Sequence, residues 1–382
     1  MTDDATASGS GPRPALPRTT TILLALAGAT VTAFGLAAMS SIAGPVLFAL
    51  VLTITVQPVR IALERRGVPR GLATGSVILS VFALLAGFFA ALFLALAQFA
   101  ELLPQFAPQL QAAATAVGDA LERIGFGPEQ IQAIVAGFDP GAILDLVGSL
   151  LGGVGGLVFW LVTVITTLLL MAMDGTYLPA LLRHLRSSRG DLVDAIGIFA
   201  NGVRRYMVVT TGLGVVQGLF NWGALALLQV PGAALWGMLS FLCSFIPNVG
   251  YFIAIIPPIV FGALVGGWPT VIWVIVVYGL INAVVQSVVQ PRVVGNAVLL
   301  GQTLTFVSVL FWAVILGPIG AIIAIPLTLL VRMLLIDSDP RARWWRPLTG
   351  DIEATRAELR EEDSSRRAER RARREEQEWH AD

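Results

Sequence analysis

Side-chain amides recur at helical spacing in two of the apolar stretches of the chain. Asn282, Gln286 and Gln290 lie four residues apart, and Gln217 and Asn221 repeat that interval in an earlier stretch. Residues four apart lie on the same face of a helix, so each row predicts one polar stripe on an apolar helix. Because an amide offers both donors and acceptors of hydrogen bonds, the stripes suit a path for a neutral solute rich in hydroxyl groups.

The distribution of acidic side chains limits the class of solute that such a path would transport. From residue 195 to residue 336 the chain contains no Asp or Glu, whereas proton and sodium transport normally uses an acid within the membrane. The amides also have a purely structural interpretation, since they often join neighbouring helices or subunits through hydrogen bonds worth about 1 kcal/mol. The spacing fits a solute path and interhelical bonding equally well.

Two apolar segments near the C-terminal end carry prolines and glycines at matching positions. When Gly250 is aligned with Gly320, Phe241 falls on Phe311. The predicted helix breaks are Pro247, Gly250 and Pro257 in the first segment and Gly317, Pro318, Gly320 and Pro326 in the second. Such residues free backbone groups from the helix, and paired breaks in two repeats point to the substrate site of a transporter. Asn248 beside the first break would add an amide to the path; alternatively, both segments are kinked hairpins that only pack against their neighbours.

The composition places these residues in an all-α polytopic integral membrane protein. Of 382 residues, 56% are hydrophobic and 13% are charged, against about 25% charged in a soluble domain, which excludes a globular soluble core. Stretches long enough to cross the membrane as helices are predicted at 21–39, 44–59, 71–99, 148–173, 207–228 and 268–290. The broken segments, 232–266 and 303–336, are each one kinked span or a re-entrant pair of half-helices, which gives eight or six full spans. In the re-entrant case, residues 207–266 form a repeat inverted relative to 268–336, as in alternating-access transporters.

Composition divides the chain into three regions. Residues 1–20 are rich in Ser, Gly, Pro and Thr and are predicted to be disordered, and residues 21–336 form the membrane transporter domain. Residues 337–382 interleave Arg with Asp and Glu, a pattern typical of a solvated cytoplasmic helix. Arginine-rich loops at 58–70 and 174–206 are predicted to be cytoplasmic, because cytoplasmic loops carry an excess of positive charge.

The segment 100–147 has the opposite character. It contains six acidic residues and one arginine, Arg123, so it is predicted to lie outside the cytoplasm. Its apolar residues recur at spacings of three and four, which predicts amphipathic helices. We expect these helices to lie on the membrane surface, to cover the path or simply to connect two spans. Both termini of the multi-pass protein then lie in the cytoplasm.

The sequence lacks the motifs that would indicate an enzyme. The two histidines, His184 and His380, lie outside the predicted spans, which excludes a histidine metal site or histidine-based catalysis in the membrane. No phosphate-binding loop that ends in Lys-Ser or Lys-Thr is present, and the single cysteine, Cys243, gives no disulfide framework. We expect no enzymatic activity, metal, cofactor or nucleic-acid partner. Arg292, at the end of a predicted span, is expected to contact lipid headgroups.

Four short motifs resemble successive signatures of a known family. They are Ile246-Pro247-Asn248-Val249-Gly250, Gln290-Pro291-Arg292-Val293-Val294-Gly295-Asn296, Gly317-Pro318-Ile319-Gly320-Ala321 and Ala324-Ile325-Pro326-Leu327. In this order they are similar to the autoinducer-2 exporter family, also called PerM-like permeases, over residues 22–335. The resemblance implies a homo-oligomer in the bacterial inner membrane that contacts lipids and a small-molecule solute. Some members are associated with export of autoinducer-2 and others with sodium–proton antiport.

The sequence departs from the family pattern at two places. Asn296 stands where the family usually has Arg or Lys, and the usual proline near Gln302 is missing, so autoinducer-2 is only one candidate solute. The residues and the resemblance together predict a permease that exports a small, neutral, polar solute by alternating access. The alternatives are a sodium–proton antiporter and a membrane scaffold that acts through its charged C-terminal tail.

Overall fold

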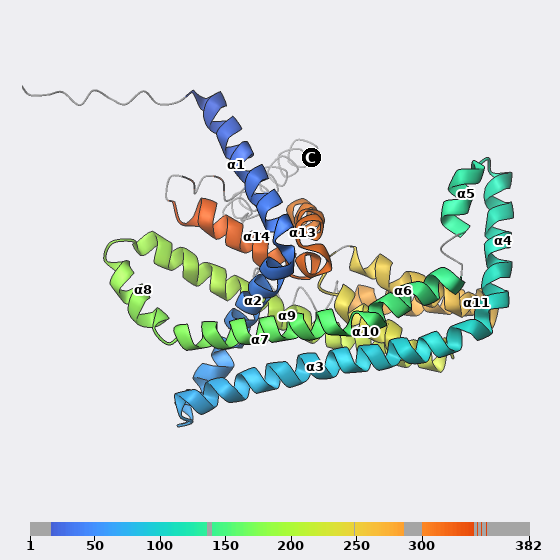
Figure 1. Ribbon diagram of the computed structural model, residues 1–382, viewed down its shortest axis with the longest axis horizontal. Helices are drawn as coiled ribbons and strands as arrows, with labels where there is room; N and C mark the ends of the chain where they lie inside the picture. Colours follow the sequence, from blue (N-terminus) through green and yellow to red (C-terminus); the bar gives the residue numbers. More distant parts are fainter. Residues whose placement is uncertain are drawn as a thin grey trace, which may run out of the picture.

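The described part of the chain is built from helices. The computed structural model describes residues 17–135, 140–247, 249–285 and 300–339, together with positions 342, 345 and 349, and it contains no strand within them. The helices pack into an elongated bundle (Figure 1). A helix suits a lipid environment because it satisfies its own backbone hydrogen bonds. The predicted all-α membrane fold is confirmed.

The first two thirds of the chain supplies five long helices. They are α1 (Arg18–Ala38), α2 (Ser40–Arg65), α3 (Arg70–Leu102), α7 (Val154–Asp174) and α9 (Gly190–Leu227). α2 and α3 contain the predicted spans, and α1 covers its span up to Ala38. α7 begins later than the predicted start at Gly148, which belongs to the preceding helix. α9 begins well before the predicted span start at Met207, because the helix continues through polar residues that a hydropathy pattern assigns to a loop.

The outer surface of the bundle is strongly apolar. Six helices within the described residues are long and apolar enough to cross a membrane. Large side chains point away from the protein on several of them; Leu227 is 87% exposed and Val314 is 85% exposed. A soluble monomer rarely exposes a continuous surface of this kind, whereas lipid accommodates it without cost. Length, hydropathy and exposure therefore agree on a multi-pass membrane protein.

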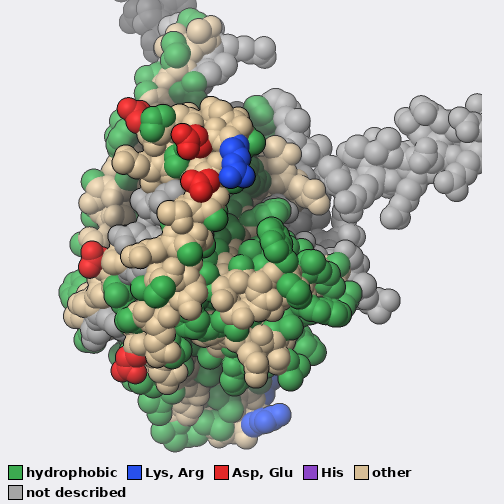
Figure 2. Space-filling model, turned by 90° about the vertical axis from the view of Figure 1, so that its right-hand side faces the viewer, with side chains coloured by type: hydrophobic (Ala, Val, Ile, Leu, Met, Phe, Trp, Pro, Cys, Tyr) green, Lys and Arg blue, Asp and Glu red, His purple; other side chains and the backbone are tan. Residues whose placement is uncertain are grey.

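Shorter helices connect the long ones. They are η1 (Leu103–Phe106), α4 (Ala107–Arg123), α5 (Pro128–Val135), α6 (Pro140–Gly152) and α8 (Leu178–Arg186). α8 lies at the left end in Figure 1, and α4 and α5 lie at the right end. Figure 2 views the right end and shows acidic side chains scattered over a largely hydrophobic and neutral surface. This separation fits the predicted placement of residues 100–147 and 174–206 on opposite sides of the membrane.

The two segments with predicted breaks each form a helical hairpin. The elements are α10 (Ala233–Cys243) and α11 (Gly250–Ala283) in the first, and α13 (Gln302–Ile322), α14 (Ala324–Arg332) and the π-helical turn η4 (Met333–Asp337) in the second. The 11 residues of α10 extend about 16 Å. Because the hydrocarbon layer is about 30 Å thick, α10 alone is too short to cross it.

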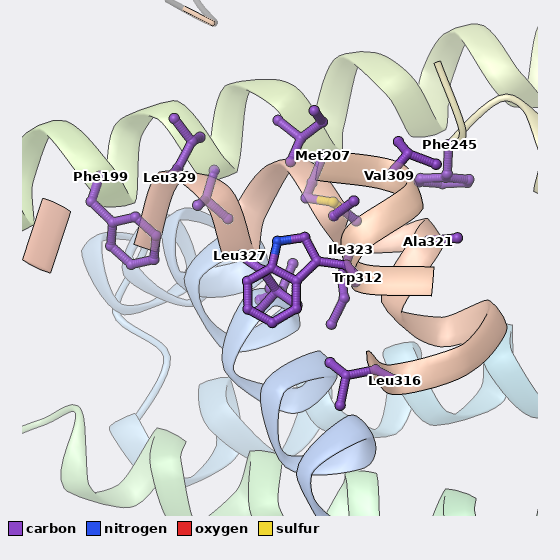
Figure 3. Packing of buried hydrophobic residues seen from close by; sticks show 14 of the residues in the cluster. Phe199, Met207, Phe245, Val309, Trp312, Leu316, Ala321, Ile323, Leu327 and Leu329 are labelled. Carbon is purple, nitrogen blue, oxygen red and sulfur yellow. The ribbon is translucent and has the colours of Figure 1, made fainter. Parts of the chain in front are cut away.

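The second hairpin lies in a hydrophobic cluster that it shares with α2 and α9. Trp312 of α13 is surrounded there by Leu327 of α14 and Met207 of α9, among other apolar side chains (Figure 3). Its indole N–H donates a hydrogen bond of 3.1 Å to Thr328 Oγ1, which joins α13 to α14. Phe245, from the turn that follows α10, belongs to the same cluster, so the turn of the first hairpin packs against the second hairpin.

A second hydrophobic cluster holds the first hairpin. The rings of Trp236 in α10 and Phe261 in α11 stack with centroids 5.7 Å apart, and Phe99 of α3 lies edge-on to both. Residue 236 therefore faces residue 261, while Cys243 faces Gly250 at the turn. This order of contacts makes α10 antiparallel to the first part of α11.

Candidate functional site

The predicted site residues fall partly outside the described part of the chain. Asn248, Gln286, Gln290, Pro291, Arg292 and Gly295 lie outside the described residues. The others lie on α9, on α11 or in the two hairpins; they are Gln217, Asn221, Pro247, Gly250, Pro257, Asn282, Gly317, Pro318, Gly320 and Pro326. They form two sets, the residues that shape the hairpins and the polar rows on α9 and α11.

Gly250 and Gly320, which the sequence pattern aligns, occupy equivalent close contacts in the two hairpins. A Cβ atom on Gly250 would collide with the carbonyl oxygen of Cys243, and a Cβ atom on Gly320 would collide with the carbonyl oxygen of Trp312. In both cases the obstacle is a backbone atom of the preceding half-helix. The collision therefore cannot be relieved by rotation of a side chain and would require the half-helix itself to move. The alignment thus corresponds to a shared feature, in which glycine allows two half-helices to approach at their backbones.

Two further glycines bend the chain in nearly the same way. The backbone angles φ and ψ are 60° and −156° at Gly267, and 67° and −153° at Gly317, which Pro318 follows. This conformation is accessible almost only to glycine. Pro257 lies within the helical part of α11, and Pro326 lies in the first turn of α14, where a missing N–H needs no partner. The bends therefore occur at the glycines, and neither of these two prolines has a non-helical backbone.

Some of the backbone groups at the break near Pro247 are hydrogen-bonded within the protein. The Gly250 N–H donates to the carbonyl oxygen of Ile246 at 2.9 Å. The Tyr206 hydroxyl of α9 donates to the carbonyl oxygen of Phe245 at 3.1 Å. These bonds hold the turn in place against α9, and they follow the general rule that buried backbone groups find partners.

The amide row on α9 lies in the interface with α10. Asn221 is fully buried, and its Nδ2 atom donates to Ser240 Oγ at 2.6 Å. Nearby, a Cβ atom on Gly218 would lie 2.8 Å from the carbonyl oxygen of Gly237, so the two backbones run very close together. Small residues combined with a hydrogen-bonded amide are typical of contacts between membrane helices. Asn221 makes the kind of contact that the interhelical interpretation describes, and Gln217 is buried one turn before it.

Both polar rows carry buried side-chain oxygens without a hydrogen-bond partner among the described residues, and on α9 this is the Oδ1 atom of Asn221. The Oδ1 atom of Asn282 is buried and has no hydrogen-bond partner among the described residues. Four residues earlier, Tyr278 is 1% exposed, and its hydroxyl also lacks a partner in the described part of the chain. Tyr278 therefore extends the predicted row by one helical turn. The four-residue spacing from Asn282 could have identified Tyr278 as part of the row. A tyrosine within an apolar stretch is, however, normally interpreted as a core residue.

Arginine side chains tie the helix ends together towards the α8 end of the bundle. Arg204 of α9 donates to the carbonyl oxygen of Ile54 at 3.3 Å and to Gln57 Oε1 at 3.2 Å, both on α2. Arg60 of α2 donates to the carbonyl oxygen of Ala172 near the end of α7 at 3.0 Å. The arginine-rich regions predicted to share the cytoplasmic side thus lie next to each other.

A buried ion pair closes the C-terminal end of the second hairpin. Arg332 Nε and Asp337 Oδ2 are 3.3 Å apart, and both side chains are 5% exposed. The predicted domain boundary after residue 336 assigns Asp337 to a solvated tail. In the structure Asp337 is the last residue of the π-helical turn η4, and its side chain is buried. In the described part of the chain, no group of His, Cys, Asp and Glu is arranged to hold a metal ion.

Comparison with known proteins gives a consistent set of relatives. A family model described as AI-2E family transporter matches residues 21–337. The AI-2 transport protein TqsA of Escherichia coli (strain K12) is 28% identical over 291 residues, which cover 76% of this chain and 84% of that protein. The putative transport protein YhhT of the same organism is 26% identical over 309 residues, covering 80% and 88%. A putative transport protein of Haemophilus influenzae is 29% identical over 340 residues, covering 87% and 96%.

Proposed function

The chain belongs to the AI-2E family of transporters, and on this premise we propose that it is a permease that exports a small, neutral, polar solute by alternating access. Membership of the family and the six apolar helices support a membrane permease. The direction of transport, the class of solute and the mechanism are the parts that we propose.

The observation that carries the proposal is the pair of glycine hairpins. Gly250 and Gly320 permit the same close backbone approach in two segments that align in sequence. Paired discontinuous helices at equivalent places in two repeats are how many transporters build a substrate site between moving parts. We propose that both hairpins re-enter the membrane and that the repeats containing them move relative to each other.

The neutrality of the proposed solute follows from the side chains of the C-terminal half. Residues 195–336 contain no Asp or Glu, and the buried polar groups on α9 and α11 are amides and hydroxyls. Among the described residues, the buried carboxylate is that of Asp337, and it is paired with Arg332. A transported cation would need an acid within the membrane, so this arrangement does not favour the sodium–proton antiporter.

Autoinducer-2 is the first solute to test. The name of TqsA assigns that molecule to a relative that is 28% identical over most of both chains. We propose a location in the bacterial inner membrane with both chain ends in the cytoplasm, which agrees with the grouping of Arg60 and Arg204 towards one end of the bundle.

Flux from liposomes tests the function directly. Purified protein is reconstituted into liposomes loaded with labelled autoinducer-2, and loss of label is followed with and without a proton gradient. Protein-free liposomes are the control, and a parallel set contains labelled ribitol. Loss that is faster than the control and saturates with concentration is expected. If neither solute leaves faster than from the control liposomes, export of a neutral polar solute is refuted.

A further inference from the structure

Tyr278 carries a hydroxyl group inside a buried hydrophobic cluster. The side chain is 1% exposed within a cluster to which α3, η1, α4, α9, α10 and α11 contribute, and its hydroxyl has no hydrogen-bond partner among the described residues. Most buried polar side-chain atoms in native proteins are hydrogen-bonded, and each exception calls for an explanation. A phenylalanine would fill the same space without an unpaired hydroxyl, so stability alone does not account for this tyrosine.

A second unpaired group lies on the same face of the same helix. The Oδ1 atom of Asn282 is buried and also lacks a partner within the described residues. Side chains four residues apart on a helix have Cβ atoms about 5–6 Å apart. The two side chains therefore leave α11 from the same face, one helical turn apart, and a molecule that spans about one turn would meet both.

The pair lies beside the turn of the first hairpin. Tyr251 directly follows Gly250, and its hydroxyl lies 3.8 Å from the position that a Cβ atom on Gly279 would occupy. Cys243, whose carbonyl oxygen abuts Gly250, belongs with Tyr278 to one buried cluster. A movement of the hairpin relative to the second part of α11 would thus change the surroundings of Tyr278.

From this geometry we propose that Tyr278 and Asn282 form a binding site for a neutral molecule with several hydroxyl groups. The inference rests on the proposed permease function and names the residues that contact its solute. The amide oxygen of Asn282 only accepts hydrogen bonds, whereas the phenol of Tyr278 both donates and accepts. A solute that satisfies both must offer at least one hydroxyl as a donor and a second oxygen within about one helical turn.

The site selects against charge. No Asp or Glu occurs between residues 195 and 336, and the buried cluster that contains Tyr278 includes many aliphatic and aromatic side chains. Burial of an unpaired charge in such surroundings is far more costly than burial of a hydroxyl group that gains partners. A furanosyl or straight-chain polyol fits these conditions, whereas a sugar phosphate with the same hydroxyl groups does not.

Substitution of Tyr278 by phenylalanine separates binding from folding. The full-length protein in detergent is heated with and without ribitol or D-ribose, and D-ribose 5-phosphate serves as the charged probe. A ligand that binds only the folded state raises Tm. We expect the neutral probes to raise Tm of the wild type, and Tyr278→Phe to weaken the apparent affinity about tenfold, the effect of one lost hydrogen bond. D-ribose 5-phosphate is expected to leave Tm unchanged.

A second tyrosine provides the matched control. Tyr206→Phe removes a hydroxyl that donates to the carbonyl oxygen of Phe245 at 3.1 Å, so it is expected to lower Tm in the absence of any probe. Tyr278→Phe is expected to keep or raise that Tm, because it removes an unpaired polar group. If Tyr278→Phe lowers Tm as much as Tyr206→Phe does, the hydroxyl is structural and the inference is wrong.

The liposome assay distinguishes failure of the inference from failure of the function. If the wild type exports a neutral solute and Tyr278→Phe exports it at the same rate, the inference is overturned while the permease function stands. If neutral probes raise Tm of the wild type but not of Tyr278→Phe, and no solute crosses the membrane, the binding site stands and the function is refuted. The expected result is slower flux and about tenfold weaker probe binding in a Tyr278→Phe protein whose Tm without probe is unchanged or higher.

Discussion

Replacement of Gly250 or Gly320 by alanine should destabilise the protein to a similar degree. A Cβ atom on Gly250 would collide with the carbonyl oxygen of Cys243 and would lie 2.7 Å from its carbonyl carbon. A Cβ atom on Gly320 would collide with the carbonyl oxygen of Trp312 and would lie 2.8 Å from its carbonyl carbon. Because ordinary contacts of this kind lie near 3.5–4 Å, the facing half-helices would have to separate by roughly 1 Å or more.

The size of the effect follows from this displacement. Forcing extra atoms into a packed interior typically costs about 1–3 kcal/mol, and we expect the upper part of that range because the obstacles are backbone atoms. At about 2 °C per kcal/mol for a large domain, Tm should fall by about 4–6 °C. Gly223→Ala on α9 is the matched control, since nothing lies within 4 Å of the position of its Cβ atom. Alanine there should be neutral or stabilise the helix by up to about 1 kcal/mol.

The assay is thermal unfolding of the three purified variants in detergent, followed by the liposome flux measurement. Gly250→Ala and Gly320→Ala should both show a lower Tm and reduced flux, and Gly223→Ala should behave like the wild type. The reasoning would be refuted if either hairpin variant matched Gly223→Ala in both measurements. A large effect at one glycine and none at the other would reject the structural equivalence of the two hairpins.

Three further predictions address other contacts. A double-mutant cycle with Asn221→Ala and Ser240→Ala should give a coupling energy of about 1 kcal/mol in thermal unfolding, as their hydrogen bond of 2.6 Å implies, and additive effects would contradict it. Arg332→Met should lower the free energy of unfolding by about 3–5 kcal/mol, because it removes this partner from the buried carboxylate of Asp337. The double variant Arg332→Met/Asp337→Leu should recover most of the lost Tm. If it does not, the ion pair is not the cause of the loss. Arg292→Cys in a Cys243→Ala background should resist a membrane-impermeant thiol reagent applied to intact cells if both hairpins re-enter the membrane, so labelling from outside would reject the re-entrant topology.

The sequence was informative wherever a local physical rule decided the structure. Apolar stretches predicted the helices, and the alignment of Gly250 with Gly320 led to two close backbone approaches of the same kind. The extent of α9 was not predictable in this way, because hydropathy reports contact with lipid and not the continuity of a helix. The α9–α10 bond between Asn221 and Ser240 was hidden for another reason, since nothing in the spacing of one helix identifies the residue that faces it.

Misassigned or overlooked polar groups had a common cause. Asp337 lies next to a strongly charged tail, so composition places it in solvent, whereas the π-helical turn buries it against Arg332. Tyr278 lies in an apolar run, so composition places it in the core, which is correct for its ring but ignores its hydroxyl. In both cases the composition of the neighbouring residues predicted the environment of the segment but not that of one polar group. For Asp337 this group is the carboxylate, and for Tyr278 it is the hydroxyl.

Both polar rows carry a buried oxygen that no described residue pairs, but on α9 the amide nitrogen of Asn221 also bonds a neighbouring helix, and we propose that the rows differ in role. On α9, Asn221 is bonded to α10 across a contact tightened by Gly218, which favours a rigid interface. On α11, Tyr278 and Asn282 carry buried groups that no described residue pairs. Alternating access requires one part that holds together and another that changes partners during the cycle. The row that bonds α10 through the amide nitrogen of Asn221 suits the first task, and we propose that the row of Tyr278 and Asn282 contacts the solute.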